Sequence, residues 1–236
     1  MQSDVTHLTV QDQLLIWLTK NKRQVLWGTV AVAVVGFAVG IYVWQQNEVQ
    51  TSASHALSKI SSGNLMGVAQ PGTTEALLKV AADYPNTSAA RRAVLIAAGN
   101  LFADGKYKES QAQFDRFLRE YRDSAFATEA MFGVAACKDA QGMAAEATTA
   151  FKDIVDHHPS ESVAPQARFE LARLYEMQNK LELARDLYQQ LAQMDPNGQL
   201  GSEANMRLAE LFNKNPSLIP VRPTAAAPVG LSPVKP

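Results

Sequence analysis

The chain has 236 residues, of which 47% are hydrophobic and 19% charged, and its formal net charge is −1. This balance excludes the strongly basic surface that nucleic-acid binding requires, and the single cysteine, Cys137, excludes an intramolecular disulfide framework. A chain of this length can bury a core by packing alone, and we expect it to carry no cofactor.

Residues 1–24 form a short N-terminal stub with a helical pattern. Thr9 and Asp12 have the spacing of a capping box. The apolar residues that follow cluster on one side of a helix: Leu14, Leu15, Trp17 and Leu18. Two interpretations remain open, an amphipathic helix on the inner membrane surface or a solvated extension of the next segment.

Val25–Trp44 is a run of twenty uncharged, mostly apolar residues. About twenty such residues cross the hydrocarbon core as a helix, so residues 25–44 are predicted to be a transmembrane helix. Cationic residues precede the run, at Lys20, Lys22 and Arg23. Positive charge stays in the cytoplasm, which predicts a cytoplasmic N-terminus and about 190 residues outside.

The run has two alternative interpretations. A cleaved signal peptide has a shorter apolar region followed by small residues at the cleavage site, and a core helix of a soluble protein is the second alternative. The length of the run, the stub before it and the glutamines after it favour an uncleaved anchor.

Three glycines within the run share one stripe of the helix: Gly28, Gly36 and Gly40. Glycines at this spacing let a second helix approach closely. They are candidate packing residues for self-association or for a neighbouring membrane helix, although glycine is also common in membrane helices in general.

The body of the chain, residues 45–214, repeats with a period of 37. The aligned positions are Ala93, Ala130, Ala167 and Ala204; Ala98, Ala135, Ala172 and Ala209; Gly105, Gly142 and Asn179; and Phe114, Phe151 and Tyr188. A repeat of this length indicates a solenoid in which each unit contacts mainly its neighbours.

Each unit reads as two helices, here called the first-type and the second-type helix. In the third unit Asn179 suits a left-handed helix stop between them, and Ala172 and Ala184 permit the two helices to approach closely. Pro196 follows the second helix, which a proline cannot continue.

This pattern resembles the tetratricopeptide repeat. The residues that carry the resemblance are Ala172, Tyr175, Asn179, Ala184, Tyr188 and Pro196. It implies an all-α protein: one N-terminal transmembrane helix followed by an α-solenoid of about three to four helix pairs with a capping helix. The expected parts are a degenerate first repeat, clear repeats at residues 88–123, 124–161 and 162–198, a capping helix at 202–214, and a disordered, proline-rich tail at 215–236.

A stub, one membrane helix and an outward tetratricopeptide array together resemble the bacterial ancillary SecYEG translocon subunit family, the YfgM-like proteins, over roughly residues 10–214. The resemblance implies a single-pass protein of the bacterial inner membrane with a periplasmic C-terminal domain. Its implied partners are the translocon, periplasmic chaperones and unfolded exported chains.

Catalysis has little support in the sequence, and the chain is not expected to be an enzyme or to bind a metal. His157 and His158 fall at a turn between units, where a solvated turn is favoured over metal ligation. Cys137 sits among alanines on a first-type helix, which favours inert packing over a reactive thiol.

Binding has more support. By analogy, one position of each first-type helix faces a concave groove, and it is apolar throughout: Leu95, Phe132, Phe169 and Met206. Charged neighbours on that side include Arg92 and Arg173. An apolar strip with a charged rim indicates an interaction site. The alternative is that these side chains only pack between units.

Two functions follow from these patterns. The leading hypothesis is a membrane-anchored, protein-binding module that handles exported proteins. The alternative is a structural scaffold for envelope or cell-division complexes that self-associates through Gly36 and Gly40.

Overall fold

The computed structural model describes Trp17, residues 20–62 and residues 72–219, and within these ranges all regular structure is helical. The elements are α2 (Lys22–Ser62), α3 (Thr73–Asp83), α4 (Ser88–Ala103), α5 (Tyr107–Glu120), α6 (Ala127–Ala140), α7 (Ala144–His157), α8 (Ala164–Met177), α9 (Leu181–Met194), α10 (Gln199–Lys214) and the 3-10 helix η1 (Pro216–Leu218). The predicted all-α solenoid is confirmed. The amphipathic helix expected in the stub falls outside the described residues apart from Trp17. The disordered tail predicted at 215–236 is wrong at its start, because η1 forms there and packs Leu218 into the protein; residues 220–236 fall outside the described residues.

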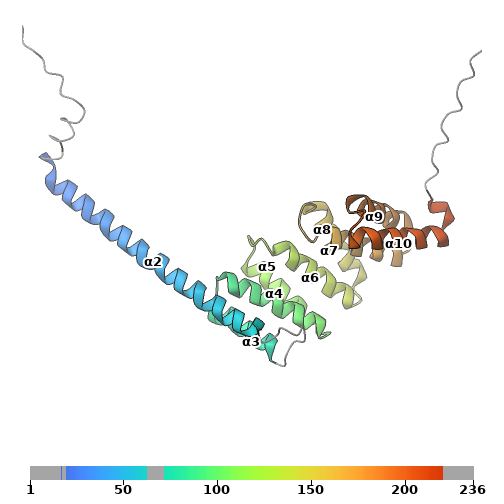
Figure 1. Ribbon diagram of the computed structural model, residues 1–236, viewed down its shortest axis with the longest axis horizontal. Helices are drawn as coiled ribbons and strands as arrows, with labels where there is room; N and C mark the ends of the chain where they lie inside the picture. The colour runs from blue at the N-terminus through green and yellow to red at the C-terminus, as the bar shows by residue number, and fades with distance from the viewer. Residues whose placement is uncertain (1–16, 18–19, 63–71, 220–236) are drawn as a thin grey trace, which may run out of the picture.

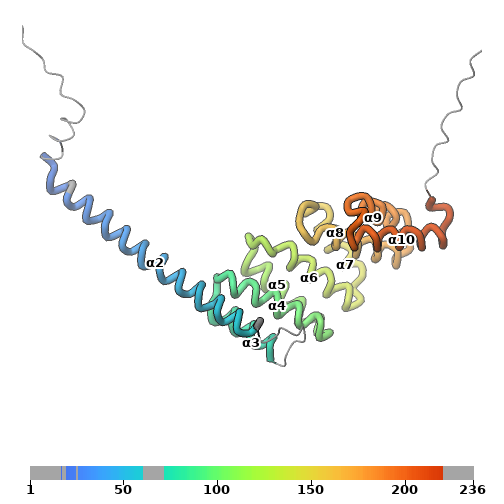
Figure 2. The backbone as a smooth tube through the Cα atoms, viewed as in Figure 1, coloured from blue at the N-terminus to red at the C-terminus, as the bar shows by residue number. Residues whose placement is uncertain are grey.

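α2 is one uninterrupted helix of 41 residues, about 60 Å long at 1.5 Å per residue. Its N-terminal half projects away from all the other helices, whereas its C-terminal half lies against α3 and α4 (Figures 1 and 2). The apolar residues of the projecting half are exposed, while Ala53 and Leu57 in the other half are buried. The sequence contains no proline between the two halves, so nothing in it ends the helix after Trp44.

Helices α3 to α10 form a succession of antiparallel neighbours, each packed on the next in chain order, from left to right in Figure 1. The expected repeats 88–123, 124–161 and 162–198 contain the pairs α4/α5, α6/α7 and α8/α9. The alanines of one aligned set are completely buried at Ala93, Ala130, Ala167 and Ala204. Because alanine has the smallest apolar side chain, these positions let adjacent helices approach closely and set the spacing of the array.

The two helices of each unit are joined by a turn with the same geometry. The turn residue has a positive φ in all three units: 75° at Gly105, 78° at Gly142 and 57° at Asn179. The next residue donates its backbone N–H across the helix end, for example from Met143 to the carbonyl of Lys138 at 2.9 Å. This is the hydrogen bond of a Schellman helix stop, and the left-handed stop predicted at Asn179 is confirmed.

α10 is the last α-helix of the array among the described residues. Ala98, Ala135 and Ala172 are fully buried, but the aligned Ala209 on α10 is exposed. No second-type helix follows α10 among the described residues, so this face of α10 has no partner helix there. η1 packs on α9 and α10 and buries Leu218, whose carbonyl lies 3.4 Å from an Arg185 guanidinium nitrogen.

Replacing a glycine in a turn and replacing a glycine within a helix are expected to change the free energy of unfolding in opposite directions. Gly142→Ala places a side chain at a positive φ and is expected to lower the free energy of unfolding by about 1–2 kcal/mol. Gly99→Ala, in the interior of α4 with open space around it, is expected to raise that free energy by up to about 1 kcal/mol. Denaturant unfolding of the full-length protein, followed by circular dichroism in one detergent, measures both. A change of the same sign in both variants would contradict this interpretation of the turns.

Candidate protein-binding surface

The four residues predicted to form an apolar ladder lie on first-type helices α4, α6, α8 and α10, but in different environments. Leu95 is partly buried against the N-terminal half of the core. Phe132 is also partly buried, and its ring meets the ring of Phe151 edge-on at 5.4 Å. Phe151 lies on the second-type helix of the same repeat, so the Phe132 side chain packs within its own unit.

Phe169 and Met206 are the extremes of this set. Phe169 is only 7% exposed and packs edge-on against Tyr188 of its own second-type helix at 5.6 Å. Met206 is 63% exposed because α10 has no second-type helix to cover it among the described residues. The structure therefore does not bring the four side chains into one exposed strip: Phe169 is a core residue, and Met206 is a surface residue.

Arg173, predicted as a charged rim residue, is engaged inside the array. Its Nε donates to Glu170 at 2.8 Å, and its guanidinium also pairs with Asp139 on α6. Burial by itself lowers the pKa of Arg173, but the two carboxylates outweigh this effect and raise the pKa. Arg173 thus links α6 to α8.

Arg92, the other predicted rim residue, is exposed and lies along a cleft between α2 and α4. Ser54, Leu57 and Ser58 of α2 line this cleft, with Arg92 and Ile96 of α4 on the facing side. It forms no ion pair with any residue that the structure describes.

Sequence reasoning missed two exposed apolar residues on first-type helices. Met177 near the end of α8 is 68% exposed, and Ile96 on α4 is 40% exposed. Ile96 does not lie on the side of α4 that carries the buried Ala93 and Ala97. The helical periodicity of the sequence could therefore have predicted that Ile96 is exposed. With Met206, these residues are exposed apolar side chains on the first-type helices.

Cys137 and His157, the candidates for a reactive thiol and a metal ligand, do not lie in a reactive arrangement. Cys137 is buried, donates to the Ser110 hydroxyl at 3.2 Å, and has a pKa raised by burial, which keeps the thiol protonated. His157 is exposed and lies 2.9 Å from the Asp153 carboxylate one turn earlier. Across the described ranges, no group of three His, Cys, Asp or Glu side chains could hold a metal ion.

The predicted packing glycines lie on the projecting half of α2. Gly28, Gly36 and Gly40 each have open space where a Cβ would stand. Among the described residues, α2 is the one helix long and apolar enough to cross a membrane, and none of its apolar window is buried inside the protein.

The sequence of this helical array matches known protein families. Residues 16–150, more than half of the chain, match the family described as tetratricopeptide repeat-like domain. The chain belongs to the tetratricopeptide repeat-like family. Residues 138–199 also match the family described as tetratricopeptide repeat, and no curated protein matches the chain.

Solved structures share this tetratricopeptide fold. A crystal structure of nearly identical TPR-like repeats from Podosopora anserina is similar with a TM-score of 0.50 at 14% identity, covering 72% of this chain and 87% of that one. The MamA RS-1 ArsTM double mutant is similar with a TM-score of 0.51 at 19% identity, covering 70% of this chain and 94% of its own. At these identities the likeness shows the fold alone. Tetratricopeptide repeats form protein-interaction modules, and this array belongs to that class.

The burial of the ladder residues predicts a large difference in stability between two truncations. Phe169→Ala is expected to lower the free energy of unfolding by about 3–5 kcal/mol, because it leaves a cavity beside Tyr188. Met206→Ala is expected to change it by less than about 0.5 kcal/mol. Denaturant titration of the two full-length variants measures the difference, and equal losses would show that Phe169 does not belong to the core.

Proposed function

We propose that the protein is a membrane-anchored module that binds other proteins at the outer face of the bacterial inner membrane. In this proposal the N-terminal stub is cytoplasmic, the first half of α2 spans the membrane, and the array is periplasmic. Its clients are exported chains or periplasmic chaperones next to the translocon, as the resemblance to the ancillary translocon subunits implies.

The observation that carries the proposal is the division of α2 into two halves. One half is apolar and exposed, which is unfavourable in water, and the other half forms part of the core of the array. The tetratricopeptide repeat-like match begins at residue 16, so it includes the apolar half together with the first repeats. Lys22 and Arg23 at the start of α2 favour a cytoplasmic N-terminus.

The exposed methionines of the first-type helices suit the binding of varied partners. Met177 and Met206 have flexible, polarisable side chains that adapt to different apolar surfaces. Anchoring keeps the array close to the membrane and raises its effective concentration there. Weak contacts along this face are therefore sufficient for a protein that meets its clients at an export site.

A site-specific photocrosslinking experiment tests the binding face. With a photoreactive residue at Met177 or Met206 in the full-length, membrane-bound protein, we expect crosslinks to other envelope proteins, identified by mass spectrometry. Leu183 on second-type helix α9 is the matched control, because it is apolar and 48% exposed but lies on the other type of helix. Crosslinks of equal yield from Leu183 would contradict a binding face on the first-type helices.

A scaffold function is the second candidate, and the open glycine stripe of α2 favours it. Among the described residues, Gly36 and Gly40 have no neighbour that would resist a second helix. A shallow apolar hollow lies nearer the start of α2, at Gly28, Thr29, Val32 and Ala33. Self-association through these residues of α2 would build an oligomer of this protein.

The stripe predicts the outcome of a double substitution. If the protein self-associates through it, Gly36→Ile with Gly40→Ile is expected to reduce the native mass in detergent to that of a monomer, because the branched side chains block close helix approach. Ala38→Ile, on the opposite side of α2, is the control and should leave the mass unchanged. A monomeric parent protein, or an unchanged mass in the double variant, would rule out this route.

A further inference from the structure

One end of the array lies next to the point where α2 leaves its apolar run. The turn between α3 and α4 borders a hollow formed with Tyr42, Gln46 and Val49 of α2. The Gln50 side chain accepts hydrogen bonds from the backbone N–H and the hydroxyl of Ser88, at 3.1 and 3.2 Å. This contact fixes the turn just beyond Trp44, the last residue of the apolar run.

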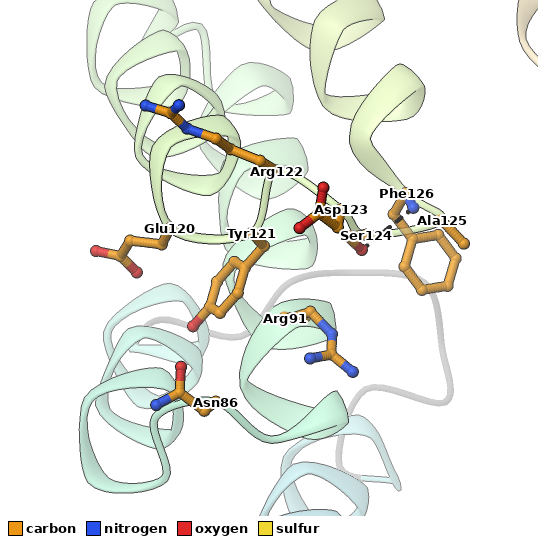
Figure 3. Close-up of a pocket in the computed structure, with 9 residues that line it drawn as sticks. All are labelled: Asn86, Arg91, Glu120, Tyr121, Arg122, Asp123, Ser124, Ala125 and Phe126. Atoms are coloured by element: carbon orange, nitrogen blue, oxygen red, sulfur yellow. Dashed lines mark hydrogen bonds between the residues drawn. The ribbon is translucent and has the colours of Figure 1, made fainter.

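The turn between α5 and α6 lies at the same end. Successive helices are antiparallel, so every second turn returns to this side of the array (Figure 1). A cleft of about 410 Å³ connects Asn86 and Arg91 with the Tyr121–Phe126 turn. Figure 3 shows Arg91 and Phe126 near each other on one side of that turn, with Arg122 extending across α5 on the other side. We call this end the proximal edge.

Four arginines near this edge have no ion-pair partner among the described residues. Arg91 and Arg122 line the cleft, Arg119 lies in the last turn of α5, and Arg92 lies in the neighbouring cleft against α2. Nearby Arg116 is already paired with Glu120 at 2.8 Å. Asp123 lies in the cleft and offsets part of the charge. Free cationic side chains therefore remain in excess at this edge.

These four arginines belong to the α4/α5 repeat. One period further along, the aligned residues are Thr128, Glu129, Asp156 and Pro159, and two periods further they are Pro165, Gln166, Gln193 and Pro196. None of these eight positions is cationic. The repeat fold does not require arginine at these positions, since the second and third units form the same helix pairs without it.

An exposed aromatic ring accompanies the arginines. Phe126 is 41% exposed at the rim of the cleft, although the aligned Val163 and Leu200 are partly covered. On α2, Tyr42 and Trp44 are also exposed at the end of the apolar run. Arginine with exposed aromatic side chains is the combination that suits the headgroup region of a membrane.

We infer that the proximal edge, comprising Arg91, Arg92, Arg119, Arg122 and Phe126, rests on anionic phospholipid headgroups of the membrane that α2 spans. This inference rests on the proposed membrane anchoring. The arginines attract lipid phosphates, and Phe126 enters the interface beside them. The contact holds the array at a fixed angle to the membrane, so that its far repeats extend away from the surface.

The attraction has a defined size and salt dependence. Each arginine close to an anionic surface favours the docked array about fivefold, and raising the ionic strength weakens this attraction within the Debye length. Neutralising Arg91 and Arg122 together is therefore expected to shift the ratio of docked to lifted arrays by roughly 25-fold.

Fluorescence quenching in lipid nanodiscs tests the inference on the full-length protein. A fluorophore is attached at Ala125→Cys, on the exposed turn beside Phe126, in a Cys137→Ala background. The nanodiscs contain either phosphatidylcholine or an equal mixture of phosphatidylcholine and phosphatidylglycerol, each with a headgroup-labelled quencher lipid. Met143→Cys, on the turn at the opposite end of α6, is the matched control position.

The inference predicts strong quenching at position 125 in the anionic nanodiscs, weaker quenching in phosphatidylcholine, and little at position 143 in either. Arg91→Gln with Arg122→Gln should abolish the difference between the two lipids, and Arg91→Lys with Arg122→Lys should restore it. Circular dichroism checks that each variant keeps its helices. If the glutamine variant has lost them, the lysine variant, which keeps the positive charge, is the one compared with the parent protein.

Three results would overturn the inference: no quenching at position 125, quenching that ignores lipid charge and the arginine substitutions, or equal quenching at positions 125 and 143. In each of these the protein still copurifies with the nanodiscs, so the proposed anchoring stands. A protein that does not enter nanodiscs at all overturns the anchoring, and the lipid contact with it.

Discussion

The uninterrupted backbone of α2 is the constraint on which the rest of the structure depends. A helix keeps its direction as long as each N–H reaches the carbonyl four residues earlier, and residues 44–50 contain no proline or glycine that would interrupt this pattern. The apolar half of α2 and the buried Ala53 and Leu57 therefore belong to one rigid element. A flexible linker would let the array turn freely, whereas a continuous helix fixes its direction relative to the apolar segment.

The array transmits this direction through close packing at small residues. Fully buried alanines recur in every unit, and adjacent helices pack on one another from α2 to α10. In a solenoid each unit is positioned by its neighbour, so the orientation set at Gln50 and Ser88 extends along the array. The Arg173 guanidinium adds a further link between α6 and α8.

The two ends of the array differ in chemistry. At the edge beside α2 lie Phe126 and arginines that have no ion-pair partner in the described part of the chain, while exposed methionines lie on the helices further along at Met177 and Met206. A cationic edge suits a lipid surface, and adaptable apolar side chains suit protein partners. In the proposed arrangement, the edge beside α2 rests on the membrane and the exposed methionines lie at a distance from it.

The sequence by itself determined the fold class, the apolar helix, the period of 37 and the left-handed stop at Asn179, because each depends on local periodicity or on the conformation of one residue. It did not determine which aligned residues are exposed. Phe169 and Met206 occupy the same position of the repeat, yet one is buried and the other is open to solvent. Likewise, no local pattern shows that Arg173 pairs with Asp139, 34 residues away, or that Arg91 lies beside the Tyr121–Phe126 turn. Only the tertiary structure decided these points, because the burial of a side chain depends on which helix packs over it, and repeat periodicity is the same whether or not that helix is present.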